Sequence, residues 1–175
     1  MEKKIEKQKM FKEVIEYYNE AMSKKMYLAA ILLDYDLLED RLDSFIRRLQ
    51  LLNNRKKLKE FVKTIIQSPT EKITDMSCKI DLVRQTIKWH ENVENVEGEN
   101  SEVAILRRSL ENIDTGAILE LLSQLDEWRK ERNDLIHNLM KLDSGALNEE
   151  KLGKIATTGF KIFRVLDGEV ARIKE

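Results

Sequence analysis

The sequence predicts an all-α protein, specifically an antiparallel helical bundle of four long helices plus short additional helices. Three observations support this fold class. One proline and six glycines in 175 residues make helix breakers scarce, whereas Leu, Ile, Lys and Glu dominate. Apolar residues recur at steps of three and four. The connections between periodic segments are modest, which favours antiparallel neighbours. We expect a single domain over residues 1–175, since this length can bury a core without disulfides.

Two long helices are expected at the start of the chain. Over residues 2 to about 25, apolar side chains recur at helical spacing among charged ones, which indicates one amphipathic helix. A second helix, from about residue 26 to 52, carries a long core-facing stripe. The members of this stripe are Leu28, Ile31, Tyr35, Leu38, Leu42, Phe45, Leu49 and Leu52.

The middle of the chain predicts shorter helices separated by turns. The Asn pair at 53–54 can end the second helix before a short helix around residues 58–65. Residues 68–71 then mark a new start, with Ser as N-cap and Pro at the first helical position. Apolar spacing continues this helix over residues 73–87. Residues 92–101 are polar and aperiodic, so we expect an exposed acidic loop there.

Two further long helices are expected after a modest one over residues 102–113. Asp114 or Thr115 can cap a helix that extends to about residue 143 and carries an apolar seam. The last helix, roughly residues 149–174, includes Gly159, which would allow close approach of a neighbour. The seam consists of Ile118, Leu121, Leu125, Trp128, Arg132, Leu135, Leu139 and Leu142.

Charge and cysteine content restrict the setting in which the protein works. The formal net charge of -1 creates no global field toward nucleic acid or membrane, so any basic surface must be local. Cys78 stands alone, which excludes an intrachain disulfide and a multi-thiolate metal site and predicts a small buried thiol in a reducing compartment. The longest apolar run, residues 26–33, is too short to span a membrane. We therefore expect a cytoplasmic protein.

Arg132 is the single charged member of the seam, and its position demands an explanation. A charge placed where a leucine would pack is costly unless something pairs with it. Either a carboxylate inside the fold neutralises the guanidinium, or the helix opens there onto a groove that accepts an anionic ligand.

Arg132, Asn133 and His137 combine side chains suited to chemistry on phosphate. Arginine offers a planar fork to phosphate oxygens, and histidine moves protons near neutrality. Five residues on a helix place Arg132 and His137 about 140° apart, so one helix cannot focus both upon one atom. Asn133 and Asp134 each share a face with His137 and could orient the imidazole. The alternative is an Arg132 paired internally with an acid and a His137 that is an ordinary surface or core histidine.

The segment from Arg132 to His137 resembles the motif of HEPN domains (higher eukaryotes and prokaryotes nucleotide-binding), in which His follows Arg after four to six residues. The polar Asn133 directly after the arginine is similar too. So is the motif's position late in a long helix of the C-terminal half, with another helix following. Residues 35–42 also resemble the early acidic amphipathic helix of several such families. The resemblance is architectural over most of the chain and specific only at Arg132, Asn133 and His137.

This resemblance implies a homodimer in which two motifs meet at a cleft and cleave RNA without metal or cofactor. His137 would act as acid or base, Arg132 would stabilise charge on the phosphate, and Asn133 would complete the catalytic set. Many HEPN proteins are toxins or serve phage defence, so a separate nucleotidyltransferase-type antitoxin is an implied partner beside RNA. Others have lost catalysis, and the alternative function is a non-catalytic helical module that binds a protein or nucleotide.

Two charged clusters complete the sequence features. A solvated face is the favoured interpretation of the acidic cluster, with a pairing of Asp36 or Glu39 to Arg132 as its alternative. A di-iron site is disfavoured, because only Asp134 and His137 have the acid-x-x-His spacing. The basic cluster is either a solvated face or a surface that follows a phosphate backbone. The acidic cluster is Asp34, Asp36, Glu39, Asp40 and Asp43, and the basic cluster is Arg47, Arg48, Arg55, Lys56, Lys57, Lys59 and Lys63.

Overall fold

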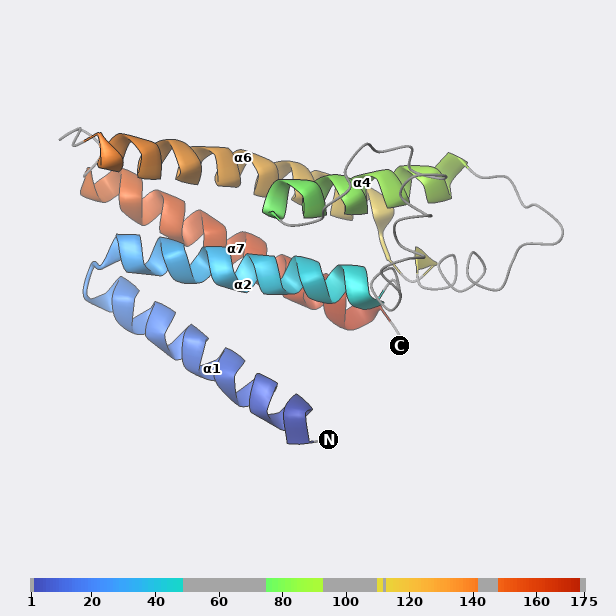
Figure 1. The fold of residues 1–175 in the computed structure, drawn as a ribbon, viewed down its shortest axis with the longest axis horizontal. Coiled ribbons are helices and arrows are strands. Elements are labelled where there is room, and N and C mark those ends of the chain that lie inside the picture. Colours follow the sequence, from blue (N-terminus) through green and yellow to red (C-terminus); the bar gives the residue numbers. More distant parts are fainter. Residues whose placement is uncertain (1, 49–74, 93–109, 112, 142–147, 174–175) are drawn as a thin grey trace, which may run out of the picture. The chain divides into compact units, whose positions relative to one another are not determined.

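The computed structural model describes residues 2–48, 75–92, 110–111, 113–141 and 148–173, and across these ranges it is helical except for short turns (Figure 1). The expected all-α class is confirmed, since no strand occurs in the described ranges. None of the described helices is both long and apolar enough to cross a membrane. The helices are α1 (Glu2–Ser23), α2 (Tyr27–Arg48), α4 (Met76–Asn92), α6 (Thr115–Met140) and α7 (Glu149–Arg172).

Several expected elements fall outside the described residues. These include the short helix around 58–65, the start at 68–71 and most of both the loop at 92–101 and the helix at 102–113. The described part of the fourth helix begins at Met76, after Asp75. The long helices α1, α2, α6 and α7 lie where the apolar periodicity predicted them, with ends that differ by a few residues.

Side-chain caps explain where three of these helices begin. The Oδ1 atom of Asp114 accepts a hydrogen bond from Ala117 N at 2.9 Å, so the prediction that Asp114 can cap α6 is confirmed. Asp75 caps α4 through Cys78 N, also at 2.9 Å. Asn148 caps α7 in the same way through Lys151 N at 2.9 Å. In each case the cap satisfies a backbone N–H that the first turn leaves without a partner.

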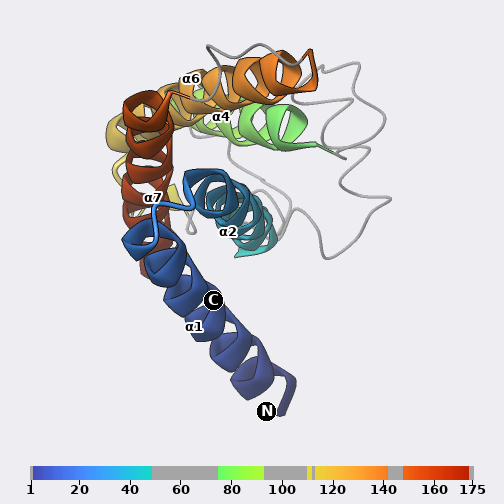
Figure 2. The ribbon, with the colours of Figure 1, turned by 90° about the vertical axis from the view of Figure 1, so that its left-hand side faces the viewer.

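The chain forms two compact units, and each is described by itself. Unit 1 comprises Met1–Glu39 and Glu127–Arg164, and unit 2 comprises Asp40–Asp126 and Val165–Glu175. In unit 1, α1 lies beside α7 (Figure 2, blue and red helices). The two helices contact each other through aromatic rings. The rings of Tyr18 and Phe160 stack with centroids 4.1 Å apart, and the Tyr18 hydroxyl donates to Ala156 O at 3.2 Å. The hydroxyl is thereby satisfied although the side chain is buried.

In unit 1, α2, α6 and α7 approach one another closely at Gly159. A Cβ atom at Gly159 would lie 2.8 Å from Asp34 Oδ2 on α2 and 2.8 Å from Trp128 Cε2 on α6. The expected close approach of a neighbour to Gly159 is therefore confirmed. Trp128 is buried, and its Nε1 donates to Ile155 O of α7 at 2.9 Å. These contacts fix the parts of α2 and α6 that carry Tyr35 and Arg132.

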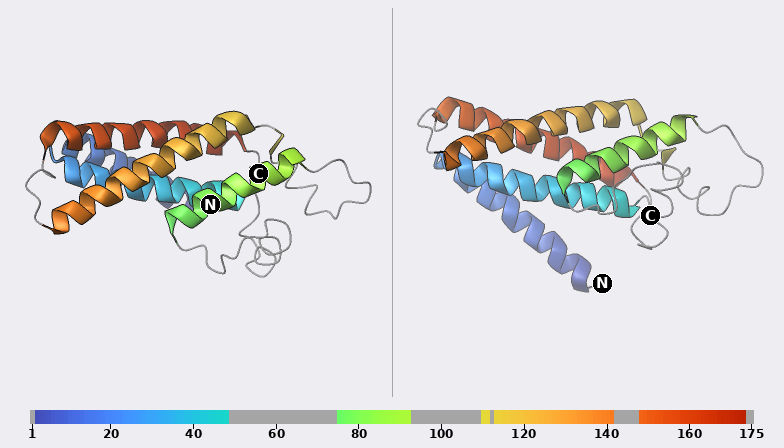
Figure 3. Two further views of the ribbon diagram at one scale, coloured as in Figure 1. Left: turned by 90° about the horizontal axis from the view of Figure 1, so that it is seen from above. Right: turned by 45° about the horizontal axis from the view of Figure 1, so that its top comes forward.

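Unit 2 is held by buried apolar side chains and by charges that its helices share. Phe45 of α2 and Ile80 of α4 are fully buried. Lys79 of α4 is only 7% exposed, and its Nζ atom lies 2.9 Å from Asp43 Oδ1 on α2. Figure 3 shows the start of α4 beside this end of α2. Arg48 Nη1 donates to Val170 O at 2.6 Å and to Ile173 O at 3.0 Å. Arg48 thus binds carbonyls at the end of α7, which have no partner within the helix.

Replacing Gly159 with alanine should destabilise the protein by about 1–2 kcal/mol, because overpacking at a 2.8 Å contact outweighs the better helix propensity of alanine. Gly168→Ala is the matched control in the same helix, since a Cβ there meets nothing within 4 Å. It should stabilise the protein by about 0.5–1 kcal/mol. Urea unfolding of both variants measures the difference. Equal stabilisation by both would contradict the close approach at Gly159.

Candidate functional site

Arg132 lies on α6 between two buried residues of the seam, Trp128 and Leu135. Its own side chain is half-buried. The guanidinium carbon lies over the ring of Tyr35 on α2, 4.5 Å from the ring centroid. Nη1 donates to the side-chain oxygen of Asn133 at 3.1 Å, and Nε is shielded from solvent without an acceptor in the described part of the chain. The arginine therefore lies against an aromatic ring at the edge of unit 1.

This arrangement differs from the internal ion pair considered from the sequence. Within the described ranges no carboxylate pairs with the Arg132 guanidinium, and neither Asp36 nor Glu39 takes that place. An aromatic ring attracts a cation through its quadrupole but carries no net charge. The positive charge of Arg132 is thus held in place without being neutralised.

Asn133 and His137 are both exposed on the C-terminal part of α6. The helix is continuous to Met140, so the angular separation expected between Arg132 and His137 applies, and the two side chains do not share a face. Asn133 links the two positions. It accepts the hydrogen bond from Arg132, and it lies one turn before His137 on the same face. A single chain therefore brings Asn133 to Arg132, but does not bring Arg132 to His137.

An exposed apolar side chain accompanies the imidazole. Met140 is 80% exposed and follows His137 by three residues. At this spacing Met140 shares a helix face with Asn133 and His137.

Asp34 is the feature that sequence reasoning missed. Asp34 is 0% exposed, and neither carboxyl oxygen has a hydrogen-bond partner among the residues that the structure describes. Burial raises the pKa of Asp34 from 3.8 to about 8, so the group is neutral at pH 7. The expected solvated acidic face is therefore wrong at this position. A signal was available, because the residues three and four positions away on both sides are apolar, namely Ala30, Ile31, Leu37 and Leu38.

The other charged residues of interest have structural partners or lie outside the described part of the chain. Asp43 pairs with Lys79, and Arg48 binds the end of α7. Arg47 lies 3.8 Å from Asp43, and the remaining members of the basic cluster fall in undescribed segments. In the described ranges no three His, Cys, Asp or Glu side chains gather as metal ligands would. Cys78 is a free, half-buried thiol, not the fully buried one expected.

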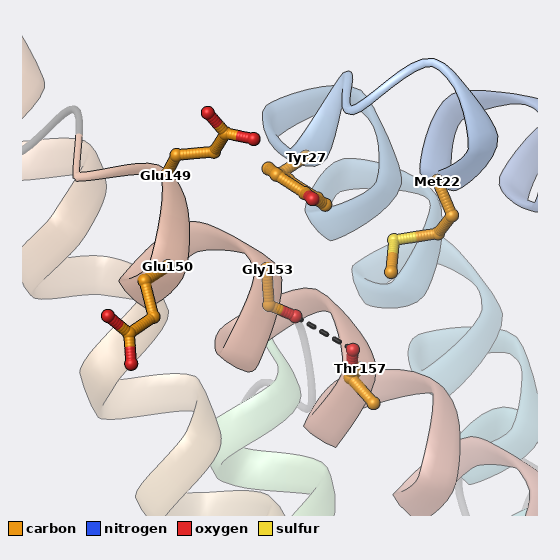
Figure 4. A pocket seen from close by; sticks show the side chains of 6 residues that line it. All are labelled: Met22, Tyr27, Glu149, Glu150, Gly153 and Thr157. Carbon is orange, nitrogen blue, oxygen red and sulfur yellow. Dashed lines mark hydrogen bonds between the residues drawn. The ribbon is translucent and has the colours of Figure 1, made fainter.

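A shallow hollow of about 510 Å³ lies elsewhere in unit 1, between the start of α2 and the start of α7 (Figure 4). Two of its polar side chains already have partners within the protein. Glu149 Oε1 lies 2.7 Å from Lys25 Nζ, and Thr157 Oγ1 donates to Gly153 O at 2.8 Å. The lining residues are Met22, Tyr27, Glu149, Glu150, Gly153 and Thr157, so the hollow does not include the Arg132 motif.

Asp34→Asn should stabilise the protein increasingly as pH rises. The folded pKa of about 8 exceeds the ordinary value of 3.8, so the folded state binds the extra proton between these values. Wild-type stability therefore falls as pH rises through this window, whereas an amide has no such dependence. The gain should be near zero at pH 4 and at most about 4 kcal/mol at pH 7. Urea unfolding at several pH values measures it.

Asp36→Asn is the matched control, because Asp36 is an exposed acid on the same helix. It should change stability little and without the same pH dependence. If Asp34→Asn destabilises the protein equally at every pH, the buried carboxyl is not protonated in the folded state.

Comparison of the chain with models of known protein families, with curated proteins and with solved structures found no match. The chemistry open to the site follows from its own side chains, which are a guanidinium that keeps its charge, an amide bonded to it and an exposed imidazole.

Proposed function

We propose that the chain is an antiparallel helical bundle of the HEPN type that works as a homodimeric, metal-independent endoribonuclease. The observation that carries the proposal is the state of Arg132. Arg132 is half-buried and held by Tyr35 and Asn133, and no carboxylate among the described residues neutralises its charge. Charge of this kind, fixed before the substrate arrives, is what stabilises a phosphoryl transition state.

Beyond binding the RNA, the proposed chemistry needs proton transfer and stabilisation of negative charge on the phosphate. In metal-free RNA cleavage a 2′-hydroxyl attacks the adjacent phosphorus while the bond to the 5′-oxygen breaks, so one proton is removed and another is supplied. His137 is exposed and can serve as the acid or the base. Arg132 is placed to stabilise the negative charge on the non-bridging phosphate oxygens. Asn133 completes the catalytic set by keeping the guanidinium close to the face that bears His137.

A second copy of the chain would resolve the angular separation between Arg132 and His137. A cleft between two protomers can draw an arginine and a histidine from different helices. Met140, 80% exposed beside His137, offers apolar surface for such a contact. The proposed biological role is that of a toxin or phage-defence component in the cytoplasm, with a separate nucleotidyltransferase-type antitoxin as partner.

The purified protein should cleave single-stranded RNA in the presence of EDTA. His137→Ala should lower the rate at least about a hundredfold by removing proton transfer. Because His137 is exposed, the free energy of unfolding should change by less than about 0.5 kcal/mol. Product formation from an end-labelled oligonucleotide measures the rate, and urea unfolding measures stability. Intact RNA after incubation with wild-type protein would end the nuclease proposal.

Arg132→Ala should also reduce cleavage about a hundredfold, because it removes charge that stabilises the transition state. Arg164→Ala is the matched control, since Arg164 is an exposed arginine of unit 1 on α7. At saturating RNA, where weaker salt-dependent binding does not limit the rate, it should stay within about twofold of the wild-type rate. Equal losses in both variants would indicate a general charge effect and no specific site.

The second candidate is a non-catalytic helical interaction module, and the outer face of α1 favours it. Met10 and Tyr17 are 64% and 61% exposed and lie seven residues apart, so they share one helix face. Exposed apolar side chains in register are typical of a docking surface for another protein. Light scattering during size-exclusion chromatography separates the two candidates when it is combined with the cleavage assay. A strict monomer that leaves RNA intact would favour the module.

A further inference from the structure

We infer that Tyr35 is the positioning residue of this site, whose ring holds the Arg132 guanidinium in one pose for a phosphodiester group. The inference rests on the proposed function and adds a residue outside the motif to it. Tyr35 belongs to α2, far from Arg132 in sequence, and in the sequence it is an ordinary member of the apolar stripe. Only the contact across unit 1 assigns it this role.

The contact geometry suits an arginine that must keep its charge. The guanidinium carbon is 4.5 Å from the Tyr35 ring centroid, inside the range of about 6 Å over which cations are attracted to aromatic faces. The second contact, with Asn133, is to a neutral amide. An arginine has five N–H donors, and only one nitrogen, Nη1, has an acceptor among the described residues. Donors therefore remain for phosphate oxygens.

A fixed pose has a direct benefit for binding and catalysis. A free arginine side chain loses much of its rotamer freedom when it is immobilised on a ligand. If the ring already restricts the side chain, less freedom is lost on meeting the phosphate.

Both side chains of the contact lie next to a close approach of three helices. Tyr35 follows Asp34, which contacts Gly159 in the tight junction of α2, α6 and α7. Arg132 follows Trp128, the other side chain of that junction, by one helical turn. Both partners of the contact therefore project from parts of the helices that the junction fixes in unit 1. A site supported in this way keeps the geometry of its reacting groups.

A purely structural role for Tyr35 makes a different prediction from a positioning role. If the ring only packed α2 against α6, its loss would act on stability whether or not Arg132 is present. If the ring acts through Arg132, its loss should lower kcat/KM for RNA when Arg132 is present. Its loss should have no further effect on kcat/KM in the Arg132→Ala background. Non-additivity between the two positions is therefore the decisive quantity.

The experiment measures kcat and KM for an end-labelled RNA in EDTA with Tyr35→Phe, Tyr35→Leu and each change combined with Arg132→Ala. Tyr35→Phe keeps the ring and should stay within about twofold of wild type. Tyr35→Leu should lower kcat/KM about tenfold, and should change it by less than about twofold in the Arg132→Ala background. Tyr27→Leu is the matched control, because Tyr27 is a half-buried tyrosine at the start of the same helix and lines the hollow outside the Arg132 motif.

A second set of variants preserves the fold if Tyr35→Leu unfolds. Phenylalanine carrying an increasing number of fluorine atoms, incorporated at position 35, keeps the shape of the ring while it weakens the attraction for a cation. The inference requires kcat/KM to fall steadily with fluorination. A flat series would overturn it, because packing alone is insensitive to the electrons of the ring.

Binding of 2′-O-methyl RNA, which such a nuclease cannot cleave, separates failure of the inference from failure of the proposed function. Binding that depends non-additively on positions 35 and 132, without cleavage of RNA, would uphold the inference and overturn the nuclease. Cleavage with additive losses would uphold the nuclease and overturn the inference. Absence of both binding and cleavage would overturn both.

Discussion

The missing side chain of Gly159 is the constraint on which unit 1 depends. Because no methyl group stands at that position, α7 lies close enough to contact both a carboxyl oxygen of Asp34 and the indole of Trp128. Because there is no room for even one methyl group at Gly159, the packing there sets the spacing of the three helices at one point. Tyr35 and Arg132 emerge next to it, so the geometry of the candidate site follows from the packing of the core.

The sequence predicted the parts of the fold that depend on local signals. Apolar spacing located the long helices, and an aspartate before an apolar run located the start of α6, because caps and periodicity act within a few residues. It also identified Gly159 as a place of close approach. Burial of Asp34 was missed, because it was grouped with the acids that follow it along the helix, although the residues one turn away on both sides are apolar.

The candidate site was predicted only in part, for a physical reason. Arg132, Asn133 and His137 are close in sequence, so their types and spacing were visible. What holds the arginine was not visible, since the contact with Tyr35 joins two helices that are distant along the chain. The sequence posed a choice between an internal carboxylate and an open groove. The described residues give a third arrangement, in which an aromatic ring supports the cation and leaves its charge intact.

The buried carboxyl of Asp34 also links the formation of unit 1 to the surrounding solution. A group that is ionised in the disordered chain and neutral in the native one must take up a proton from the buffer when the chain folds near neutrality. Melting then returns that proton to the buffer. Calorimetric enthalpies measured in phosphate and in Tris should consequently differ by the heats with which these two buffers ionise.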